Sequence, residues 1–207
     1  LILGASKQLV GQNNLVTSGG WRNELSVLPM LSGERLGVIG LGAIGSSVAR
    51  VGKAFGMEIV TWSPNMTPER AAVENAKSVS LDELLSTSKV VTLHLVAGPG
   101  TKGLISADQL ALMRPDSILV NTSRSALINM TDLCAALKQG RPGQAAVDVF
   151  DIEPLPSNDP LRNTPNLLAT PHLGFIAEPI FETFSKGITQ TLEAWLDQKP
   201  VPHPFEP

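Results

Sequence analysis

The chain has 207 residues, of which 43% are hydrophobic and 17% are charged. This composition predicts a folded chain with room for one sizeable α/β domain and excludes a disordered protein. With a formal net charge of −3 and a pI of about 5.6, general attraction to nucleic acid or to an anionic membrane is not expected, and no apolar run reaches transmembrane length.

The first 33 residues are interpreted as a broken helix and a passage rich in glycine, asparagine and serine. Leu1 is not an initiator methionine, and the apolar stretch that follows it lacks the basic region of a signal peptide. We therefore interpret residues 1–20 as the remnant of an inter-domain helix and linker, in a chain that begins in the middle of a helix. Glycine, asparagine and serine are concentrated between Gly11 and Gly20, which is typical of a loop.

From Arg35 onward, short apolar runs alternate with segments of helical spacing. Six runs are predicted to be strands: Arg35–Gly40, Glu58–Trp62, Lys89–Leu95, Ser117–Asn121, Gln144–Phe150 and Asn166–Thr170. Helical spacing predicts helices at Ala43–Phe55, Thr131–Gln139 and Glu178–Gln198. Capping boxes predict two more helices, which begin after Ser80 and Ser106. This alternation predicts an α/β fold, a doubly wound parallel sheet with helices on both faces. The domain is expected to span residues 21–190, followed in residues 191–207 by the end of the last helix and an extended, proline-rich tail.

The single cysteine, Cys134, lies in the predicted helix Thr131–Gln139. Its helical apolar spacing favours a buried structural residue over a nucleophile. One cysteine excludes a disulfide within the chain, which fits a reducing compartment, and we expect a cytoplasmic protein.

A glycine-rich turn joins the first predicted strand to the first predicted helix. Its sequence, Gly40-Leu41-Gly42-Ala43-Ile44-Gly45, has G-x-G-x-x-G spacing and is followed by a second strand. Gly40 permits the tight turn, Gly42 lets the backbone approach a pyrophosphate, and Gly45 allows close packing of the helix on the strand. The start of the helix offers free N–H groups to the phosphates. In this context the turn predicts a dinucleotide site of the Rossmann type rather than a turn without a ligand.

The second predicted strand ends without the acidic residue that would normally accept the adenosine ribose hydroxyls. Ser63 follows this strand, and no acid is present until Glu69. Ser63 carries no charge to repel a 2′-phosphate, and Asn65 or Arg70 could approach one. The residues therefore leave the choice between NAD and NADP open, and an ordinary turn beginning at Ser63 is the alternative.

Three further segments follow predicted strands and carry polar side chains. They are Asn121–Ser125, Val147–Pro154 and Thr170–Phe175. Because ligands of an open α/β sheet bind at the carboxyl ends of its strands, we expect all three at the same edge as the glycine turn. Each alone fits an ordinary loop, but their combination favours a site.

The side chains of these segments suit the chemistry of a 2-hydroxy acid. A guanidinium, here Arg124, binds both oxygens of a carboxylate and stays charged at any working pH. A histidine, here His172, can take or give the proton that accompanies hydride transfer. A carboxylate beside that imidazole, here Glu153, would orient it and stabilise its protonated form.

In combination and in this order, five segments resemble the D-isomer-specific 2-hydroxyacid dehydrogenases, the family of phosphoglycerate dehydrogenase, glyoxylate/hydroxypyruvate reductase and D-lactate dehydrogenase. The segments are Leu36–Gly45, His94-Leu95 with Gly103–Ile105, Asn121–Arg124, Asp148–Pro154 and Thr170–Gly174. The resemblance extends from about Trp21 to Pro200. It implies an oxidoreductase that transfers a hydride between NAD or NADP and a small 2-keto or 2-hydroxy acid.

The resemblance also implies roles for individual residues. Arg124 would bind the substrate carboxylate and help to polarise the carbonyl, His172 would be the acid/base, and Glu153 would be its carboxylate partner. Asp148 would contact the nicotinamide carboxamide, and His94 would pack beside the cofactor. No metal is implied. The cofactor-binding set implied is Gly40, Gly42, Ala43, Ile44, Gly45, Ser63, Leu95, Thr122, Ser123, Arg124, Asp148, His172 and Gly174.

The chain departs from the family pattern at several positions. Ser125 stands where glycine is usual, Ser63 replaces the usual acid, and His94–Pro99 lacks the common proline after the strand. The largest departure is length, because family members have a first, substrate-binding domain. Here that N-terminal domain is expected to be largely missing, with only the end of its connecting helix left in Leu1–Val10, so the chain alone should bind cofactor but turn over poorly.

Other functions stay open beside a 2-keto acid reductase. Formate oxidation also resembles this family, but those enzymes have an amide where Glu153 stands. A cofactor-sensing protein like the family's corepressors can retain Arg124, Glu153 and His172, and only the lack of a basic or peptide-binding appendage disfavours it. The substrate side chain is unassigned, and a homodimer through the cofactor domain is expected from the relatives.

Overall fold

The computed structural model describes residues 1–22 and 27–202. Its internal contacts divide the chain into two units, Leu1–Pro171 and His172–Pro207, and each is described here by itself. The last part of the predicted tail, residues 203–207, lies outside the described residues.

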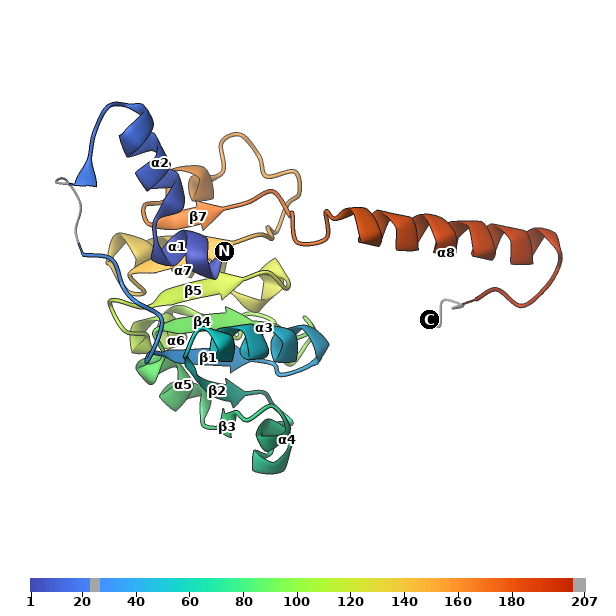
Figure 1. Cartoon of the computed structure of the whole chain (residues 1–207), viewed down its shortest axis with the longest axis horizontal. Helices are drawn as coiled ribbons and strands as arrows, with labels where there is room; N and C mark the ends of the chain where they lie inside the picture. The colour runs from blue at the N-terminus through green and yellow to red at the C-terminus, as the bar shows by residue number, and fades with distance from the viewer. Residues whose placement is uncertain (23–26, 203–207) are drawn as a thin grey trace. The chain divides into compact units, whose positions relative to one another are not determined.

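The first unit is built on one sheet of seven parallel strands in the order β3-β2-β1-β4-β5-β6-β7 (Figure 1). The strands are β1 (Arg35–Ile39), β2 (Glu58–Trp62), β3 (Lys77–Ser78), β4 (Val90–Leu93), β5 (Ile118–Asn121), β6 (Gln144–Val147) and β7 (Leu167–Ala169). The chain first builds outward from β1 to β3 and then returns to the other side of β1 with β4. This confirms the doubly wound parallel sheet and the six predicted strands, whereas β3 was not predicted.

Helices lie before, between and after the strands, and one of them, Leu9–Thr17, covers most of the stretch Gly11–Gly20 whose composition had indicated a loop. They are α1 (Ile2–Ser6), α2 (Leu9–Thr17), α3 (Ala43–Ala54), α4 (Pro68–Val73), α5 (Leu81–Thr87), α6 (Ala107–Leu112), α7 (Met130–Lys138) and α8 (Glu178–Leu196). The two predicted capping residues do begin helices. Ser80 Oγ accepts a hydrogen bond from the backbone N–H of Glu83 at 3.1 Å, and Gln109 Oε1 accepts one from the backbone N–H of Ser106 at 3.3 Å.

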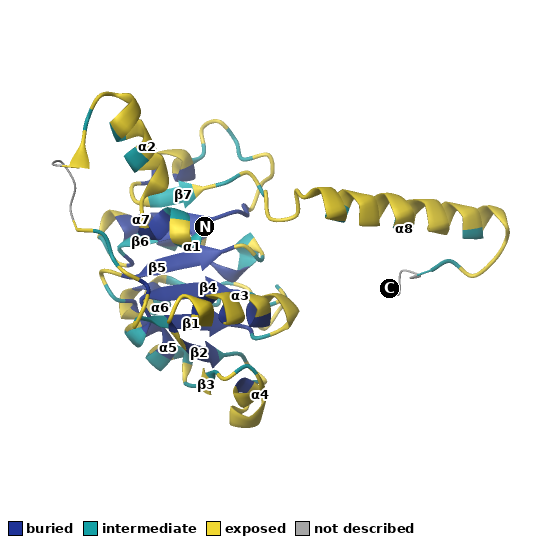
Figure 2. Ribbon diagram, in the orientation of Figure 1, coloured by how far each residue is buried: buried dark blue, intermediate teal, exposed yellow. Residues whose placement is uncertain are grey.

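Both faces of the sheet are apolar, because alternate residues of each strand enter different cores. One core joins β1 residues Leu36 and Val38 to Ala5 of α1 and Ala49 of α3. The other core lies under α5, α6 and α7, and Leu84, Leu110 and Leu133 are its buried helical members. Figure 2 shows the strands as the most deeply buried part of this unit. Each fully buried leucine stabilises the fold by roughly 2 kcal/mol relative to an exposed one.

Cys134 is buried in α7, as predicted. Its Sγ accepts a hydrogen bond from Thr164 Oγ1 at 3.3 Å. Thr164 follows the 3₁₀ turn Pro160–Asn163, so the thiol packs inside the fold.

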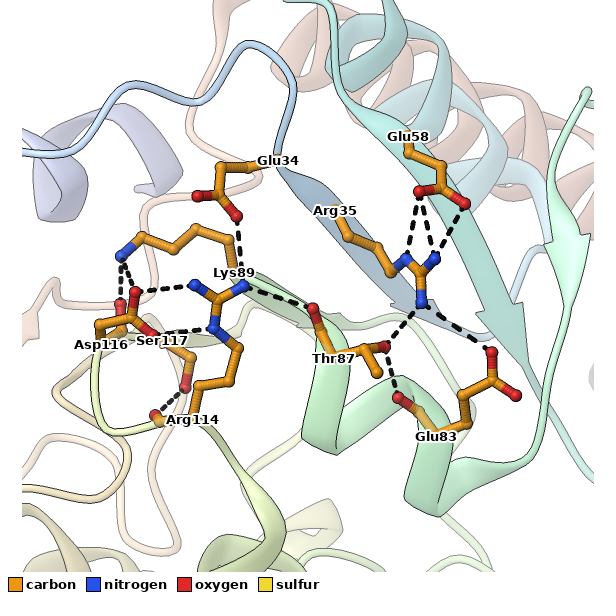
Figure 3. A network of polar contacts seen from close by, with 9 residues as sticks. All are labelled: Glu34, Arg35, Glu58, Glu83, Thr87, Lys89, Arg114, Asp116 and Ser117. Carbon is orange, nitrogen blue, oxygen red and sulfur yellow. Dashed lines mark hydrogen bonds and ion pairs between the residues drawn. The ribbon is translucent and has the colours of Figure 1, made fainter.

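The amino ends of the strands carry a network of charges (Figure 3). Lys89, 6% exposed, donates from Nζ to Asp116 Oδ2 at 2.9 Å and to the Asp116 carbonyl. Arg114 binds both carboxylate oxygens of Asp116 at 2.8 Å and reaches Glu34 at 3.2 Å. These contacts hold the pKa of Asp116 at about 2, mainly through the hydrogen bond from Arg114. The charged residues therefore tie the strand starts together at the edge opposite the carboxyl ends.

The second unit consists mainly of α8, which has no buried residue. Phe181, Phe184, Ile188, Leu192 and Trp195 recur at helical spacing and are all exposed. Neither α8 nor any other helix within the described ranges is long and apolar enough to cross a membrane.

Candidate cofactor and substrate site

The carboxyl ends of the strands form one register row. Trp62 pairs with Ile39, Ile39 with Leu93, Leu93 with Asn121, Asn121 with Val147, and Val147 with Ala169. The residues that follow this row share one edge of the sheet: Ser63, Gly40, His94, Thr122, Asp148 and Thr170. The sheet register thus brings together the predicted site segments of the first unit.

The glycine turn has the shape that its sequence predicts. Gly40 has a φ of +97°, and a Cβ on it would lie 2.9 Å from the backbone of His94 and Leu95. A Cβ on Gly45 would lie 2.0 Å from the Gly40 carbonyl oxygen, so only glycine fits there. A Cβ on Gly42 would meet nothing within 4 Å, which leaves open space over the turn.

The amino end of α3 faces this turn with unpaired donors. The first bond of the helix runs from the backbone N–H of Ser46 to the carbonyl of Gly42 at 2.8 Å. Among the described residues, none accepts a hydrogen bond from the N–H of Ala43 or Ile44. Such N–H groups, together with the helix dipole, form a phosphate cradle. The open space and the donor set fit a dinucleotide pyrophosphate.

The loop after β4 lies between the glycine turn and the loop after β5. Ser123 Oγ donates to the Leu95 carbonyl at 2.6 Å, which joins two residues predicted to line the cofactor. His94 is half-buried, and its Nε2 lies 3.0 Å from Thr92 Oγ1. Burial lowers the pKa of His94 to about 4, so the ring is neutral near pH 7. A neutral ring fits packing beside a cofactor better than proton transfer.

The loop that carries Arg124 is held by the last residue of β5. Asn121, fully buried, accepts at Oδ1 from the backbone N–H of Ser123 at 3.0 Å. Its Nδ2 donates to the carbonyl of Arg124 at 2.9 Å. The exposed guanidinium of Arg124 bonds only the Ser123 carbonyl, at 2.8 Å, and no carboxylate of the described residues pairs with it. The Arg124 guanidinium therefore lies at the edge of the sheet, and its remaining N–H groups are available to bind an anion.

Two carboxylates lie beyond β6. Asp148 is 3% exposed and accepts a hydrogen bond from Thr170 Oγ1, and its backbone N–H bonds the Asn121 carbonyl at 3.0 Å. Glu153 is exposed, and its Oε1 accepts from the backbone N–H of Phe150 at 2.9 Å. That bond folds the Glu153 carboxylate back toward the end of β6, on the same edge as Arg124.

His172 and Gly174 open the second unit. The His172 backbone is left-handed, with a φ of 54°, and its ring contacts Phe175 edge-on with centroids 5.5 Å apart. A non-glycine residue in this region is strained, and such strain concentrates at functional sites. The pairing of His172 with Glu153 stays a prediction, because the two residues belong to separate units.

The structure gives supporting roles to three residues for which the sequence indicated none. Asn121 orders the Arg124 loop, Thr170 bonds Asp148, and Thr92 bonds His94. The sequence feature that could have indicated these roles is a polar residue at or near the end of an otherwise apolar strand, because a buried polar side chain needs a hydrogen-bond partner.

Residues 1–174 match the model of the D-isomer specific 2-hydroxyacid dehydrogenase family, NAD binding domain. The chain belongs to this dehydrogenase family. It is 38% identical over 179 residues to a glyoxylate reductase of Aeropyrum pernix, an alignment that covers 83% of this chain and 53% of the relative. It is 36% identical over 178 residues to a D-3-phosphoglycerate dehydrogenase of Synechocystis sp., covering 86% of this chain and 32% of the relative.

A solved structure gives the same family fold. The crystal structure of a glyoxylate reductase from Paecilomyes thermophila superposes with a TM-score of 0.82 at 32% identity, covering 93% of this chain and 58% of the other. The chain spans about half the length of the glyoxylate reductase of Aeropyrum pernix. The match over residues 1–174 thus identifies the NAD-binding domain of this dehydrogenase family, as the sequence predicted.

Proposed function

We propose that the chain is the cofactor-binding part of a reductase that converts a small 2-keto acid to the D-isomer of the 2-hydroxy acid. Glyoxylate and hydroxypyruvate are the substrates to test first, because relatives bear the names glyoxylate reductase and hydroxypyruvate reductase. The observation that carries the proposal is the Arg124 guanidinium, which no carboxylate of the described residues pairs with, on a loop that Asn121 holds at the same sheet edge as the glycine turn.

Each site residue has one task in this proposal. Arg124 binds both oxygens of the substrate carboxylate and turns the keto group toward the nicotinamide. His172 donates a proton to the keto oxygen, and Glu153 stabilises the imidazolium before that transfer. Asp148 accepts a hydrogen bond from the carboxamide of the nicotinamide. The bound cofactor supplies the hydride.

The test is reduction of glyoxylate and hydroxypyruvate by the protein in its natural length, followed through the absorbance of the reduced nicotinamide. Arg124→Lys keeps the charge but loses the paired N–H groups of the guanidinium, so kcat/KM for the keto acid should fall about a hundredfold, a larger change than in the cofactor Kd. His172→Asn should lower kcat by about a hundredfold or more. Arg50→Lys, at an exposed arginine of α3 paired with Glu74, is the control.

Unchanged kcat/KM in Arg124→Lys would contradict the carboxylate role. Tight cofactor binding with no turnover of any 2-keto acid would favour the alternative, a cofactor-sensing protein of the corepressor kind. Formate oxidation would instead appear as reduction of the oxidised cofactor by formate. It is disfavoured because Glu153 stands where those enzymes have an amide.

We also propose that two copies associate through the face formed by α1 and α3. An apolar groove of about 640 Å³ lies there, and the exposed side chains of Leu3, Ile44, Val51 and Phe55 line it. Monomers rarely expose large contiguous apolar patches, which supports a second copy as occupant. Light scattering should give the mass of a dimer, and Val51→Asp should give a monomer; a wild-type monomer at micromolar concentration would refute the dimer.

The remaining parts of the proposal concern boundaries and location. We propose residues 21–190 as the dinucleotide-binding domain, flanked by the linker remnant 1–20 and the C-terminal end 191–207. A cytoplasmic location fits the single thiol of Cys134, which is buried and hydrogen-bonded.

A further inference from the structure

The turn after β2 lies beside the glycine turn. Trp62, the last residue of β2, pairs with Ile39, and its carbonyl accepts the backbone N–H of Gly40 at 2.9 Å. Ser63 therefore comes directly next to the turn over which the pyrophosphate is proposed to lie. In a doubly wound fold this position meets the adenosine ribose, and a carboxylate here would accept the ribose hydroxyls and repel a 2′-phosphate.

The turn contains a cation where that carboxylate is missing. The backbone N–H of Met66 bonds the Ser63 carbonyl at 3.0 Å, which closes the turn. Arg70 donates from Nη1 to the Asn65 carbonyl at 2.5 Å, so its guanidinium lies against the same turn. Of its five N–H donors only this one is used, and none of the carboxylates in residues 1–22 and 27–202 forms an ion pair with it.

The other charges near the turn are already engaged. Arg50 is paired with Glu74 at 2.8 Å. The Glu69 carboxylate interacts with its own backbone N–H and with the Thr67 side chain, and these contacts lower its pKa. Glu69 is thus ionised but held at the start of α4, whereas the Arg70 donors remain available. Ser63 adds a neutral hydroxyl that can donate to a phosphate oxygen.

We infer that this site prefers NADPH to NADH, with the 2′-phosphate of the adenosine ribose bound by Arg70 and Ser63. The inference rests on the proposed function, because it takes the glycine turn as the pyrophosphate site. A guanidinium matches a phosphate through two parallel hydrogen bonds, and the charge assistance makes these bonds stronger than neutral ones.

The experiment is calorimetric titration of the natural-length protein with NADPH, NADH, 2′,5′-ADP and 5′-AMP. The last two probes differ by the 2′-phosphate alone. We expect NADPH to bind about tenfold or more tightly than NADH, and 2′,5′-ADP to exceed 5′-AMP by a similar factor. Arg70→Gln should remove most of both differences by weakening only the two phosphorylated ligands.

Two further variants test which charges near the turn set the cofactor preference. Ser63→Asp places a carboxylate at the end of β2 and should invert the preference, so that NADH binds more tightly. Arg50→Gln removes a neighbouring positive charge and should leave both ratios unchanged. Equal losses in Arg70→Gln and Arg50→Gln would overturn the assignment of Arg70, because a general electrostatic effect would then explain both.

The outcomes separate this inference from the proposed function. Binding of NADH as tightly as NADPH, or more tightly, overturns the inference and leaves the proposed cofactor site standing. Binding of neither cofactor overturns both.

Discussion

The buried side chain of Asn121 donates a hydrogen bond to the carbonyl of Arg124 at 2.9 Å. The same amide accepts the N–H of Ser123 at 3.0 Å, so one residue at the end of β5 orders the whole loop. Asn121 is therefore a positioning residue for the arginine that is proposed to bind the substrate.

Asn121→Ala should cost about 1–3 kcal/mol of stability, because a backbone donor and a backbone acceptor lose their partner. It should also raise KM for the 2-keto acid about tenfold, since Arg124 is no longer fixed. Asn129→Ala is the matched control, because Asn129 caps α7 through the N–H groups of Thr131 and Asp132 and its side chain bonds neither Ser123 nor Arg124. If both variants change KM equally, Asn121 does not position Arg124.

Two glycines of one turn should respond in opposite ways. Gly45→Ala would place a Cβ 2.0 Å from the Gly40 carbonyl, and we expect a loss of about 3 kcal/mol or more. Gly42→Ala meets nothing within 4 Å, so stability should change by less than about 0.5 kcal/mol while cofactor affinity falls at least about tenfold. Thermal unfolding and titration separate the two effects, and unchanged affinity in Gly42→Ala would argue against a pyrophosphate over this turn.

His94 should make stability depend on pH below neutrality. Its pKa is about 4 in the folded chain and about 6.5 when exposed, so between these values the unfolded chain binds more protons. The stability is fully present above pH 6.5 and should fall by about 3 kcal/mol as the pH drops to 4. His94→Gln should flatten this slope in urea unfolding at a series of pH values, and an unchanged slope would show that the ring is not the cause.

Asp116 should make stability depend on pH at lower pH values than His94 does. Its pKa is held at about 2, against an ordinary value of 3.8, by Arg114 and Lys89 (Figure 3). The contribution of this carboxylate is therefore present above pH 3.8 and lost as the pH falls through 2. Since Asp116 is half-exposed, salt should weaken the effect. Asp116→Asn should make acid unfolding less steep, whereas Glu193→Gln on exposed α8 should not.

The 207-residue chain alone should bind NADPH but reduce glyoxylate poorly or not at all. Its relatives are longer, and the rest of their length has no counterpart here. Titration and an activity assay on the same sample test this, and substantial turnover by the isolated chain would overturn it.

The hydrophobic pattern predicted most of this fold. β2 begins and ends at the predicted residues, and α3 ends within one residue of its predicted end. β3 was missed because it has two residues, Lys77 and Ser78, without an apolar pattern. α4 was missed because it has only six residues, although Thr67 caps it and Pro68 stands at its first position.

The sequence predicted which candidate residues share the carboxyl edge of the sheet, but not the residues that hold them in place. Strand ends in a parallel sheet share an edge, so Gly40, Asp148 and Arg124 could be placed together from the sequence. The bond from Asn121 to the Arg124 loop depends on side-chain geometry across a turn, which spacing does not encode. The left-handed backbone of His172 is likewise set by the surrounding structure rather than by its residue type.

The register row at the carboxyl ends also governs how this chain can tolerate insertions and deletions. The strands before the glycine turn, Thr122 and Asp148 are each paired on both sides, as Asn121 is paired with Leu93 and Val147. Removing one residue inside β5 would shift the loop by about 3.3 Å and turn its side chains to the opposite face of the sheet. Removing one residue from the connection between α7 and β6 would leave the pairing of residues between strands unchanged. Substitutions next to the strand ends therefore change the site without changing the pairing of the strands, and the connections at the opposite edge can change in length without moving the site.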